Sequence, residues 1–429
     1  MIKTLHINID EITRVEGHGN VVVDIKNSRV KEARFEIVES PRFFEMMLKG
    51  RRYDEAHHIM SRICGICAVS HTSASLKAIE AAMDIKITRQ AELIRRLAFA
   101  GEIVQSHILH LFFLVFPDFF GALSIAPLLD AHPLLVKTGL RLKRLANEVC
   151  SIVSGRHIHP ISLFPGGVVH TPLPKELKRL KAALAESFED LEYTLDFLSK
   201  IKTPQYIKPR EFISLKTRKG YAAYDGIPVS SMNYSIKPDN YTRKIKEYVV
   251  SHSTAKQAKS PKGAFMVGAL ARVSNNFKQL GPRAKKAAGK ASFNPPFDNP
   301  FLNNMAQLIE CFHMTEESMG IIDGLLAIGP RLEPVKKPRS YGRGIGIVEA
   351  PRGTLYHDYA IGKDGLIEKA ECIIPTAQNL RSIEEDLACF VPTILDKPQG
   401  VIKRSIESLV RAYDPCISCS THFMDVKFV

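Results

Sequence analysis

The segment Arg62-Ile-Cys-Gly-Ile-Cys-Ala-Val-Ser-His71 lies near the start of this 429-residue sequence and contains a Cys-x-x-Cys pair. A second pair lies near the other end, in Asp414-Pro-Cys-Ile-Ser-Cys-Ser-Thr-His422. Two cysteines at this spacing can bind the same metal ion. Backbone N–H groups at a tight turn or at the start of a helix stabilise the thiolate form of such cysteines, and a nearby cation such as Arg62 has the same effect. Four such sulfur donors suit zinc, nickel, low-spin iron or an iron–sulfur centre.

The two pairs are far apart in the chain, because Cys64 and Cys416 are separated by 352 residues. The cysteine pairs of structural zinc sites lie about 15–20 residues apart. A site that joins opposite ends of a chain is more typical of a buried functional metal centre. A structural four-cysteine zinc site and unlinked thiols remain as alternatives. A thioredoxin-type redox pair fits less well, because neither pair follows a clear βαβ opening.

The composition is that of a folded soluble protein, with 45% hydrophobic and 24% charged residues. These values exclude a disordered, collagen-like or disulfide-scaffold chain. The first ten residues include Lys3, His6 and Asp10 and contain no apolar signal-peptide core. The longest apolar stretch, Ile108–Phe116, is shorter than the roughly 20 residues that a membrane-spanning helix needs. We therefore expect no transmembrane segment and a cytoplasmic location.

Basic residues are in excess, and the formal net charge is +14. The excess is distributed over segments 137–144, 175–181, 200–219 and 281–290. No segment interleaves aromatic residues with polar groups that read bases, so nucleic acid is not an expected partner. Solvated faces account for most of this charge, and the basic segments are candidate docking surfaces for a protein partner.

Hydrophobic periodicity predicts long amphipathic helices in the middle of the chain and short strands toward both ends. The predicted helices are Thr88–Phe116, Leu134–Ser154, Pro174–Lys200, Phe301–Leu326, Ser382–Phe390 and Gly400–Ala412. The predicted strands are Val21–Ile25, Ala33–Val38, Leu355–Tyr359 and Ala370–Ile374. Segments Lys202–Asn240 and Ser260–Pro300 are rich in Pro, Gly and Asn, and we predict that they are irregular surface excursions.

This pattern predicts an α+β fold that is mainly α-helical, with a core of long packed helices and small peripheral β-sheets. We see no internal repeat and no low-complexity tract. Because the two cysteine pairs must meet, we expect a single domain over residues 1–429. Within it, we expect residues 1–60 to be β-rich, residues 61–330 to be mainly helical, and residues 331–422 to add further strands and helices.

The segment Gly342-Arg-Gly344-Ile-Gly346 invites comparison with a dinucleotide-binding loop. It does not follow a strand and open a helix, and no βαβ unit of about 30 residues surrounds it. We therefore expect a bent strand near the metal site, and we expect that this chain itself binds no nucleotide.

The motifs around the cysteines resemble those of the large, catalytic subunit of nickel–iron hydrogenases. The two signature motifs of that family correspond to Arg62-x-Cys64-Gly-x-Cys67-x-x-x-His71 and Asp414-Pro-Cys416-x-x-Cys419-x-x-His422. Other motifs of the family resemble Arg14-Val-Glu16-Gly-His18, Arg42-Phe-Phe-Glu45, Glu349-Ala-Pro-Arg352-Gly353 and Ile374-Pro-Thr376. The resemblance runs from residue 11 to residue 422. All four cysteines are present, which indicates the catalytic branch rather than the relative in respiratory complex I that has lost them.

The resemblance implies a nickel–iron centre between four thiolates, with carbonyl and cyanide ligands on the iron. Cys64 and Cys416 would bind nickel terminally, and Cys67 and Cys419 would bridge nickel and iron. It also implies reversible heterolytic oxidation of dihydrogen to protons and electrons. Electron donation from the thiolate sulfurs to nickel would let the metal change its oxidation state during this reaction. The electrons would pass to an iron–sulfur small subunit, because this chain contains no further cysteine-rich cluster motif.

The resemblance also implies catalytic roles for three residues beside the metals. Glu16 would be the first proton acceptor beyond Cys419. Arg352 would lie over the metal pair, where its guanidinium would polarise dihydrogen or hold a cyanide. Asp414 would hold Arg352 in place through a charge-assisted contact.

Further residues are implied as ligands or as partners of ligands. Thr376 would donate a hydrogen bond to a cyanide, and His71 would form a hydrogen bond near a bridging sulfur. Glu45, His422 and the backbone carbonyl of Cys372 would bind Mg²⁺, or Fe²⁺, near the C-terminus. An oxygen-rich site with one imidazole suits such a hard cation.

One departure from the family pattern lies in Gln105-Ser106-His107, where oxygen-tolerant and periplasmic relatives have an aspartate. Ser106 and the segments Gly155–Pro160 and Gly268–Arg272 resemble the cytoplasmic, multi-subunit type. The subgroup implied is the sulfhydrogenase or NAD(P)-linked type, or the heterodisulfide-reductase-linked type. Its partners would include flavin-containing electron-transfer or heterodisulfide-reductase subunits. Maturation proteins would load the centre, and an endopeptidase would remove residues 423–429 as a propeptide.

Two other functions remain open at this point. The first is a hydrogen-sensing homologue with low turnover, which activity per nickel distinguishes from the enzyme. The second is a structural tetra-cysteine zinc-binding protein, which metal analysis of the matured protein distinguishes.

Overall fold

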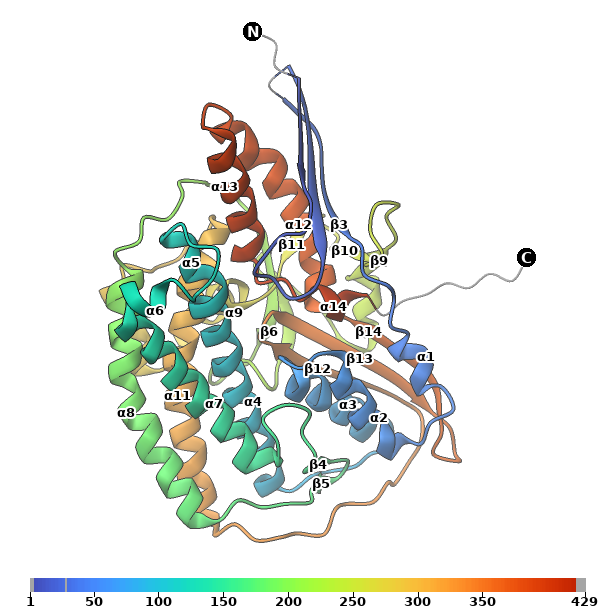
Figure 1. Ribbon diagram of the computed structural model, residues 1–429. Coiled ribbons are helices and arrows are strands. Elements are labelled where there is room, and N and C mark those ends of the chain that lie inside the picture. Colours follow the sequence, from blue (N-terminus) through green and yellow to red (C-terminus); the bar gives the residue numbers. More distant parts are fainter. Residues whose placement is uncertain (1–3, 28, 422–429) are drawn as a thin grey trace, which may run out of the picture.

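The computed structural model describes residues 4–27 and 29–421. Long helices form its core, and small sheets lie beside them (Figure 1). The long helices are α4 (Arg89–Leu109), α7 (Pro133–Ser154), α8 (Pro174–Leu198) and α11 (Asn303–Ile328). Helices α4 and α8 both pack against α7 and α11. This arrangement confirms the predicted α+β fold class with a core of long helices.

Local sequence explains where the long helices begin and what they bury. Helix α8 begins with Pro174 in its first turn, and the Leu173 N–H donates to the Glu176 carboxylate at 2.9 Å. Helix α7 likewise begins at Pro133 and ends before Gly155, which has the positive φ of 78° typical of a helix C-terminus. The apolar face of α8 recurs at helical spacing and is buried at Leu177, Leu180, Leu184 and Leu191.

The predicted helix Thr88–Phe116 is interrupted in the structure. Helix α4 ends at Leu109, a π-helix (η2, His110–Val115) follows, and α5 (Phe116–Phe119) completes the run. Pro117 explains the interruption, because proline has no N–H to donate and its ring clashes with the carbonyl of the preceding turn. The wider turn begins at His110, whose ring contacts the backbone of Arg411 near the other end of the chain.

By length and composition alone, the helical run Arg89–Phe119 is long and apolar enough to cross a membrane. In this structure, 78% of its most apolar window is buried inside the protein. Helices α7 and α11 pack against it. This burial is that of a core helix.

Two antiparallel sheets contain the predicted strands of the two chain ends. The N-terminal sheet has the order β1 (Leu5–Ile9), β2 (Gly19–Lys26) and β3 (Arg29–Ile37), and it extends away from the helical core (Figure 1). The C-terminal sheet has the order β12 (Arg343–Ala350), β13 (Gly353–Ile361) and β14 (Ile367–Ile373). Helix α3 (Ala68–Ala82) packs on β12 and β13.

The two segments that we predicted to be irregular also contain regular elements, so this prediction was wrong in part. They contribute a sheet of order β11-β6-β7-β8 and two helices, and most of these elements are short. Three of the four strands span only two to four residues, too few to show a clear period, and α10 buries only alanines. The elements are β6 (Glu211–Lys216), β7 (Ile227–Ser230), β8 (Tyr234–Ser235), β11 (Phe265–Met266), α9 (Ala269–Asn276) and α10 (Pro282–Lys290).

Other short elements connect these layers. The predicted helix Ser382–Phe390 begins earlier in the structure, at Pro375, because a proline is compatible with the first helical turn. The further helices are α1 (Phe44–Leu48), α2 (Tyr53–Met60), α6 (Leu128–Ala131), α12 (Pro375–Phe390), α13 (Gln399–Ala412) and α14 (Ile417–Ser420). The further strands are β4 (Leu163–Phe164), β5 (Gly167–Val168), β9 (Lys246–Tyr248) and β10 (Gln257–Lys259).

Glycines allow α3 to lie directly against β12. A Cβ atom at Gly344 would lie 2.1 Å from the carbonyl oxygen of Ala78, and one at Gly346 would lie 1.9 Å from that of Ala74. Both glycines belong to β12, which confirms the strand predicted for this glycine-rich segment. The close approach packs the middle and the end of α3, the helix that directly follows Cys67, against the C-terminal sheet.

Replacing Gly346 with alanine is expected to lower the free energy of unfolding by about 3 kcal/mol or to prevent folding, because the added methyl group meets rigid helix backbone. Gly320→Ala in α11 is the matched control. Nothing lies within 4 Å of the added Cβ at Gly320, and alanine favours a helix over glycine by about 1 kcal/mol. Thermal unfolding of the purified protein measures both variants. A Gly346→Ala protein as stable as the wild type would contradict the close packing of α3 on β12.

Candidate metal centre

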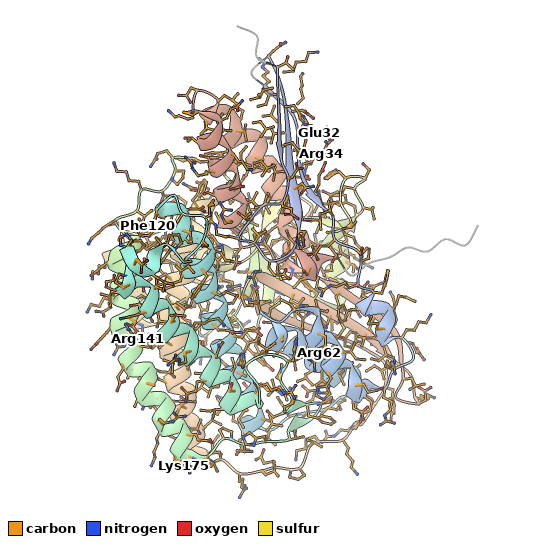
Figure 2. All side chains as sticks on the ribbon, in the orientation of Figure 1. Glu32, Arg34, Arg62, Phe120, Arg141 and Lys175 are labelled. Atoms are coloured by element: carbon orange, nitrogen blue, oxygen red, sulfur yellow. The ribbon has the colours of Figure 1, made fainter. Side chains whose placement is uncertain are left out.

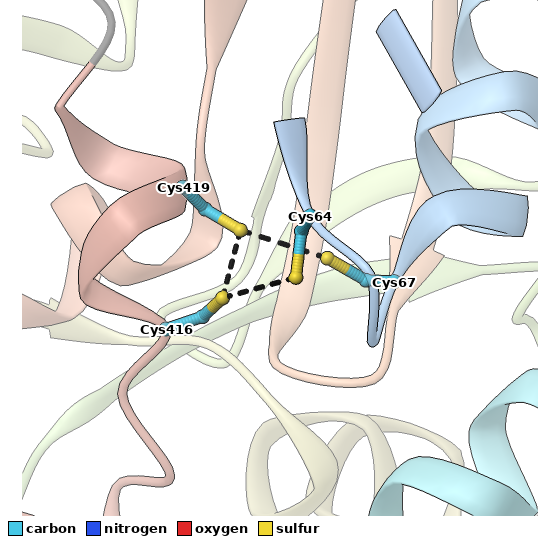
Figure 3. Close-up of side chains that lie close together, drawn as sticks. All are labelled: Cys64, Cys67, Cys416 and Cys419. Atoms are coloured by element: carbon cyan, nitrogen blue, oxygen red, sulfur yellow. Dashed lines mark hydrogen bonds between the residues drawn. The ribbon is translucent and has the colours of Figure 1, made fainter. Parts of the chain in front are cut away.

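The structure brings the four cysteines of the two Cys-x-x-Cys pairs together (Figure 3). Their sulfur atoms all lie within 4.8 Å of one another, and each residue is at most 5% exposed. Cys64 Sγ lies 3.4 Å from Cys416 Sγ, and Cys67 Sγ lies 3.6 Å from Cys419 Sγ. All are free thiols, so four sulfur donors face one buried space.

The spacing of these sulfurs fits a thiolate-bound metal centre. Metal–sulfur bonds of about 2.3 Å place neighbouring sulfurs of a tetrahedral site about 3.8 Å apart. The observed sulfur–sulfur distances lie on both sides of that value: the Cys416 and Cys419 sulfurs are 2.8 Å apart, and no two of the four sulfurs are more than 4.8 Å apart. Four soft donors suit nickel, iron and zinc equally, so the sulfur geometry alone does not choose among these metals.

Each cysteine pair lies where a short helical segment meets an extended one. Cys64 follows a 3-10 turn, η1 (Ser61–Ile63), and Cys67 is the N-cap residue of α3. Cys416 is the N-cap residue of α14. The Ile66 N–H points to Cys64 Sγ at 3.3 Å, so backbone donors face the sulfur as expected at a helix start.

A buried carboxylate supports the start of α3. Glu102 on α4 accepts hydrogen bonds from the backbone N–H groups of Val69 and Ser70 and from the Ser70 hydroxyl. These contacts use donors that the first turn of a helix leaves without partners. Burial nevertheless raises the pKa of Glu102 to about 8. Glu102 therefore fixes the first helical turn that follows Cys67.

Arg42 connects the two cysteine loops directly. Its Nη2 donates to the Ile63 carbonyl oxygen at 2.6 Å and also to the Ser418 carbonyl oxygen. Its backbone N–H donates to the carbonyl oxygen of Thr421 at 2.6 Å. One side chain thus holds the residue before Cys64 next to a residue between Cys416 and Cys419.

Glu16 lies beside the second cysteine pair. Its backbone forms an isolated parallel bridge with Cys416, and its carbonyl accepts the Ile417 N–H at 2.9 Å. Its Oε2 lies 3.1 Å from Cys416 Sγ and accepts the Ser418 N–H at 3.1 Å. We expected this carboxylate beyond Cys419, whereas its contact in the structure is with Cys416, because the backbone bridge aligns the two residues.

Arg352 and Asp414 form a buried ion pair. Arg352 Nη2 lies 2.8 Å and Nε 3.1 Å from Asp414 Oδ1, and Nε also donates to the Asp414 carbonyl oxygen at 2.8 Å. Arg352 is 4% and Asp414 is 2% exposed. Arg352 Nη1 also lies 3.4 Å from the Ser106 hydroxyl, at the position where the family pattern has an aspartate. Asp414 therefore orients the guanidinium.

The charges of this pair act on the thiols. Burial would lower the pKa of the Arg352 guanidinium, but the charges of Asp414 and Cys416 outweigh burial and raise that pKa. Hydrogen bonds from Cys416 and Cys419 hold the pKa of the Cys64 thiol well below its ordinary value. Burial raises the pKa of the Cys416 and Cys419 thiols. Metal binding must therefore displace protons from the second pair.

Arg62, a candidate for stabilising thiolates, does not lie in the centre. Its side chain is exposed and is labelled on the surface in Figure 2, together with Arg141 and Lys175 of the basic segments. Charge compensation in the centre comes instead from the buried Arg352.

Thr376 and His71 both lie close to the cysteine loops. The Thr376 hydroxyl accepts the Cys416 N–H at 3.0 Å, and Thr376 is 2% exposed. His71 lies one helical turn after Cys67, and its Nδ1 is 3.2 Å from Nε2 of His357. His71 therefore lies in a buried polar network. Thr376 and His71 each lie next to one of the two loops that contain the cysteine pairs.

Two of the three residues implied for a hard cation also meet. Glu45 Oε1 accepts the Cys372 N–H at 2.7 Å. Glu45 borders a cavity of about 610 Å³, which Glu247, Glu368, Glu371 and four lysines also line. Carboxylate oxygens in this cavity fit a hard cation. His422, the third residue, lies outside the described residues.

Sequence reasoning did not find several polar residues beside the centre. Gln307 Nε2 donates to Asp414 Oδ2 at 2.9 Å, and Gln307 Oε1 lies 2.6 Å from Nδ1 of His110. Arg272, fully buried, donates to the carbonyl oxygens of Ala350 and Pro351, directly before Arg352. Gln307 lies inside the apolar helix predicted for Phe301–Leu326, so its only signal was a polar residue inside an apolar stretch. Arg272 lies in a segment that we predicted to be irregular.

Comparison with known proteins is consistent with this geometry. The family model described as "Nickel-dependent hydrogenase" matches residues 42–137 and 301–422, and the model described as "HoxL-like" matches residues 6–40. The alpha chain of sulfhydrogenase 1 from Pyrococcus furiosus is 34% identical over 423 residues, which cover 97% of this chain and 98% of the relative.

Two further similarities span nearly the whole chain. One component of the F420-non-reducing hydrogenase of Methanothermobacter thermautotrophicus is 31% identical over 454 residues, covering 98% of this chain and 95% of the relative. A crystal structure of an NAD⁺-reducing nickel–iron hydrogenase in the H₂-reduced state superposes with a TM-score of 0.89 at 28% identity, covering 98% of this chain and 100% of that one. With its four buried cysteines in the matched segments, this chain belongs to the large-subunit family of nickel-dependent hydrogenases.

Proposed function

We propose that this chain is the catalytic subunit of a nickel–iron hydrogenase, which interconverts dihydrogen with two protons and two electrons. The observation that carries the proposal is the buried set of four free thiols, contributed by both ends of the chain, in a nickel-dependent hydrogenase. A centre buried this deeply suits a substrate as small as dihydrogen.

The four cysteines hold a nickel–iron centre in this proposal. Cys64 and Cys416 would be ligands of nickel, Cys67 and Cys419 would be ligands shared by nickel and iron, and the iron would carry carbonyl and cyanide ligands. When bound, this centre supplies the redox chemistry that splits dihydrogen heterolytically. Thr376, whose hydroxyl oxygen accepts the Cys416 N–H, has its hydroxyl hydrogen available for a cyanide.

Glu16 is the proposed first proton acceptor. Its Oε2 lies 3.1 Å from Cys416 Sγ, within reach for direct transfer between sulfur and carboxylate. Glu16 is partly exposed, whereas Cys416 is buried, so the carboxylate carries the proton away from the buried centre.

Arg352 and Asp414 are the proposed catalytic ion pair. Asp414 holds the guanidinium through three contacts, and the charge of Arg352 interacts with the thiols of Cys416, Cys67 and Cys64. Such a preorganised cation stabilises negative charge without rearranging during the reaction. His71 is proposed to orient a bridging sulfur from the first turns of α3.

A second metal site is proposed near the C-terminus. Glu45, the Cys372 carbonyl and His422 bind Mg²⁺ or Fe²⁺ there. The contact of Glu45 with the Cys372 backbone supports this proposal, because it places the carboxylate beside one of the other two groups.

The electrons leave through an iron–sulfur small subunit in this proposal. Relatives of this chain are named as subunits of F420-non-reducing hydrogenase and of sulfhydrogenase, which supports a multi-subunit, cytoplasmic enzyme. Flavin-containing or heterodisulfide-reductase subunits complete the complex, and maturation proteins assemble the centre.

Purified native complex is expected to oxidise dihydrogen with an artificial acceptor such as a viologen and to contain one nickel per chain. Its infrared spectrum is expected to show metal carbonyl and cyanide bands. Metal analysis and infrared spectroscopy measure both. Zinc without nickel in matured protein would instead identify a structural site, and stoichiometric nickel with negligible turnover would identify a hydrogen sensor.

Arg352→Lys is expected to lower hydrogen-oxidation activity by about 100-fold while the nickel content stays unchanged, because lysine keeps the charge but loses the oriented guanidinium. Asp414→Asn tests the same arrangement from the acceptor side, since the asparagine carboxamide binds the guanidinium more weakly than a carboxylate. Lys286→Met on the surface helix α10 is the matched control for loss of a basic group. Full activity of Arg352→Lys at full nickel loading would refute the proposed role.

The mature chain is expected to end at His422. We propose that residues 1–422 form one domain and that an endopeptidase removes residues 423–429 after nickel is loaded. Intact-mass measurement of the active complex and of chain expressed without nickel tests this. Active, nickel-loaded protein that still ends at Val429 would contradict it.

A further inference from the structure

One face of helix α4 contacts the chain on both sides of Cys67. Glu102 accepts two backbone N–H groups in the first turn of α3. Gln105, three residues later, is 2% exposed, and its Nε2 donates to the backbone carbonyl oxygen of Ile66 at 3.2 Å. Residues three apart lie on the same face of a helix. Helix α4 therefore holds the peptide just before Cys67 as well as the helical turn just after it.

The contact of Gln105 restrains one peptide plane. The Ile66 carbonyl belongs to the planar peptide that joins Ile66 to Cys67, so a hydrogen bond to this oxygen limits rotation of that peptide. On the other side, the Cys67 carbonyl oxygen accepts the His71 N–H at 3.1 Å, as the N-cap residue of α3 does. Cys67 is thus held through the backbone on both sides, and these two peptides set the direction of its Cα–Cβ bond.

Packing alone does not fix the loop between the two cysteines. A Cβ atom added at Gly65 would have one atom of the described residues within 4 Å, Cγ2 of Ile158 at 3.7 Å. The Ile66 N–H points to Cys64 Sγ at 3.3 Å, which is a contact inside the loop itself. The contact of Gln105 with Ile66 therefore ties a loosely packed loop to a core helix.

Lys143 on α7 supports Gln105 from the solvent side. Its Nζ lies 2.8 Å from Gln105 Oε1 and 2.9 Å from Asn147 Oδ1, one turn later on the same helix. Lys143 belongs to the basic segment 137–144, a candidate docking surface in the sequence. The other basic residues of that segment are exposed, whereas Lys143 is partly buried and contacts α4. This lysine therefore serves the interior of the protein.

The partners of Gln105 allow one orientation of its amide. The Ile66 carbonyl oxygen only accepts hydrogen bonds, so the NH₂ group of Gln105 must face it. Gln105 Oε1 then faces the N–H groups of Lys143. The reverse orientation would place two acceptors 3.2 Å apart at Ile66 and two donors 2.8 Å apart at Lys143. Lys143 therefore favours the orientation in which Gln105 binds the cysteine loop.

We propose that Lys143 and Gln105 are positioning residues that set the direction of the Cys67 thiol in the metal centre. They act through the backbone of Ile66 and not through the reacting groups. The effect on catalysis rests on the proposed function, in which Cys67 is a ligand shared by nickel and iron. Removing a group that orients a metal ligand lowers metal affinity or activity by about 10- to 100-fold.

Hydrogen–deuterium exchange of the purified complex tests the contacts with the loop. Gln105→Met keeps a side chain of similar length without an N–H for Ile66. We expect exchange in peptides covering residues 62–67 to be about tenfold faster in this variant, because a hydrogen bond of the loop is lost, and about threefold faster in Lys143→Met. Lys143→Arg keeps a donor and is expected to exchange like the wild type. Lys137→Met, at an exposed position on the same helix, is the matched control for loss of a basic group.

Infrared spectroscopy and kinetics of the nickel-loaded complex test the direction of the thiol. At equal nickel content, Gln105→Met is expected to shift the metal carbonyl and cyanide bands and to lower kcat about tenfold with KM for dihydrogen unchanged. Lys143→Met is expected to shift the same bands by a smaller amount, and Lys143→Arg to leave them in place.

Unchanged exchange in both Gln105→Met and Lys143→Met would overturn the proposal. Faster exchange with unshifted bands and full kcat would also overturn it, because the contacts would then serve only the stability of the loop. If Gln105→Met fails to assemble, the comparison of Lys143→Met with Lys143→Arg decides. The exchange measurement needs no hydrogenase activity, so a complex that contains zinc and no nickel would refute the proposed function without deciding this test.

Discussion

The structure depends on four sulfur atoms from opposite ends of the chain converging in one buried space. Deprotonated thiols this close repel one another, so the convergence requires external support and positive charge. Arg42 joins the backbone of both cysteine loops, and Glu16 pairs its backbone with Cys416. Glycines in β12 bring α3, and with it Cys67, against the C-terminal sheet. The fold is therefore organised around a site that local structure alone could not form.

Around this centre, buried charges occur in compensated groups. Arg352 is paired with Asp414, and Arg272 is paired with both Glu310 and Glu349. A buried charge without a partner is strongly destabilising, which explains why these residues lie in networks rather than alone. The Arg272 group fixes the backbone before Arg352, while the group of Gln307 and His110 fixes Asp414. Two separate networks thus restrain the two halves of one ion pair.

Sequence patterns predicted the four longest helices and most strands of the two terminal sheets, because these elements are long or strongly periodic; they did not delimit β1 or α3. They did not predict the π-helix at His110, which follows from Pro117 and from packing against the C-terminal part of the chain. They also missed α10 and the β11-β6-β7-β8 sheet, whose short elements are stabilised by tertiary contacts. Local propensity is a weak guide when an element spans only about two to nine residues.

By itself, the sequence determined the chemistry that the chain makes available: four soft sulfur donors, acidic and basic groups in fixed motifs, and apolar faces long enough to form a core. Only the tertiary structure decided which of these groups meet. Glu16 contacts Cys416 rather than Cys419, Arg352 rather than Arg62 compensates the thiols, and Gln307 connects His110 to Asp414. The Gln307–Asp414 and Glu16–Cys416 contacts join residues 107 and 400 positions apart, and a chain carries no local signal for a partner that only packing brings within reach.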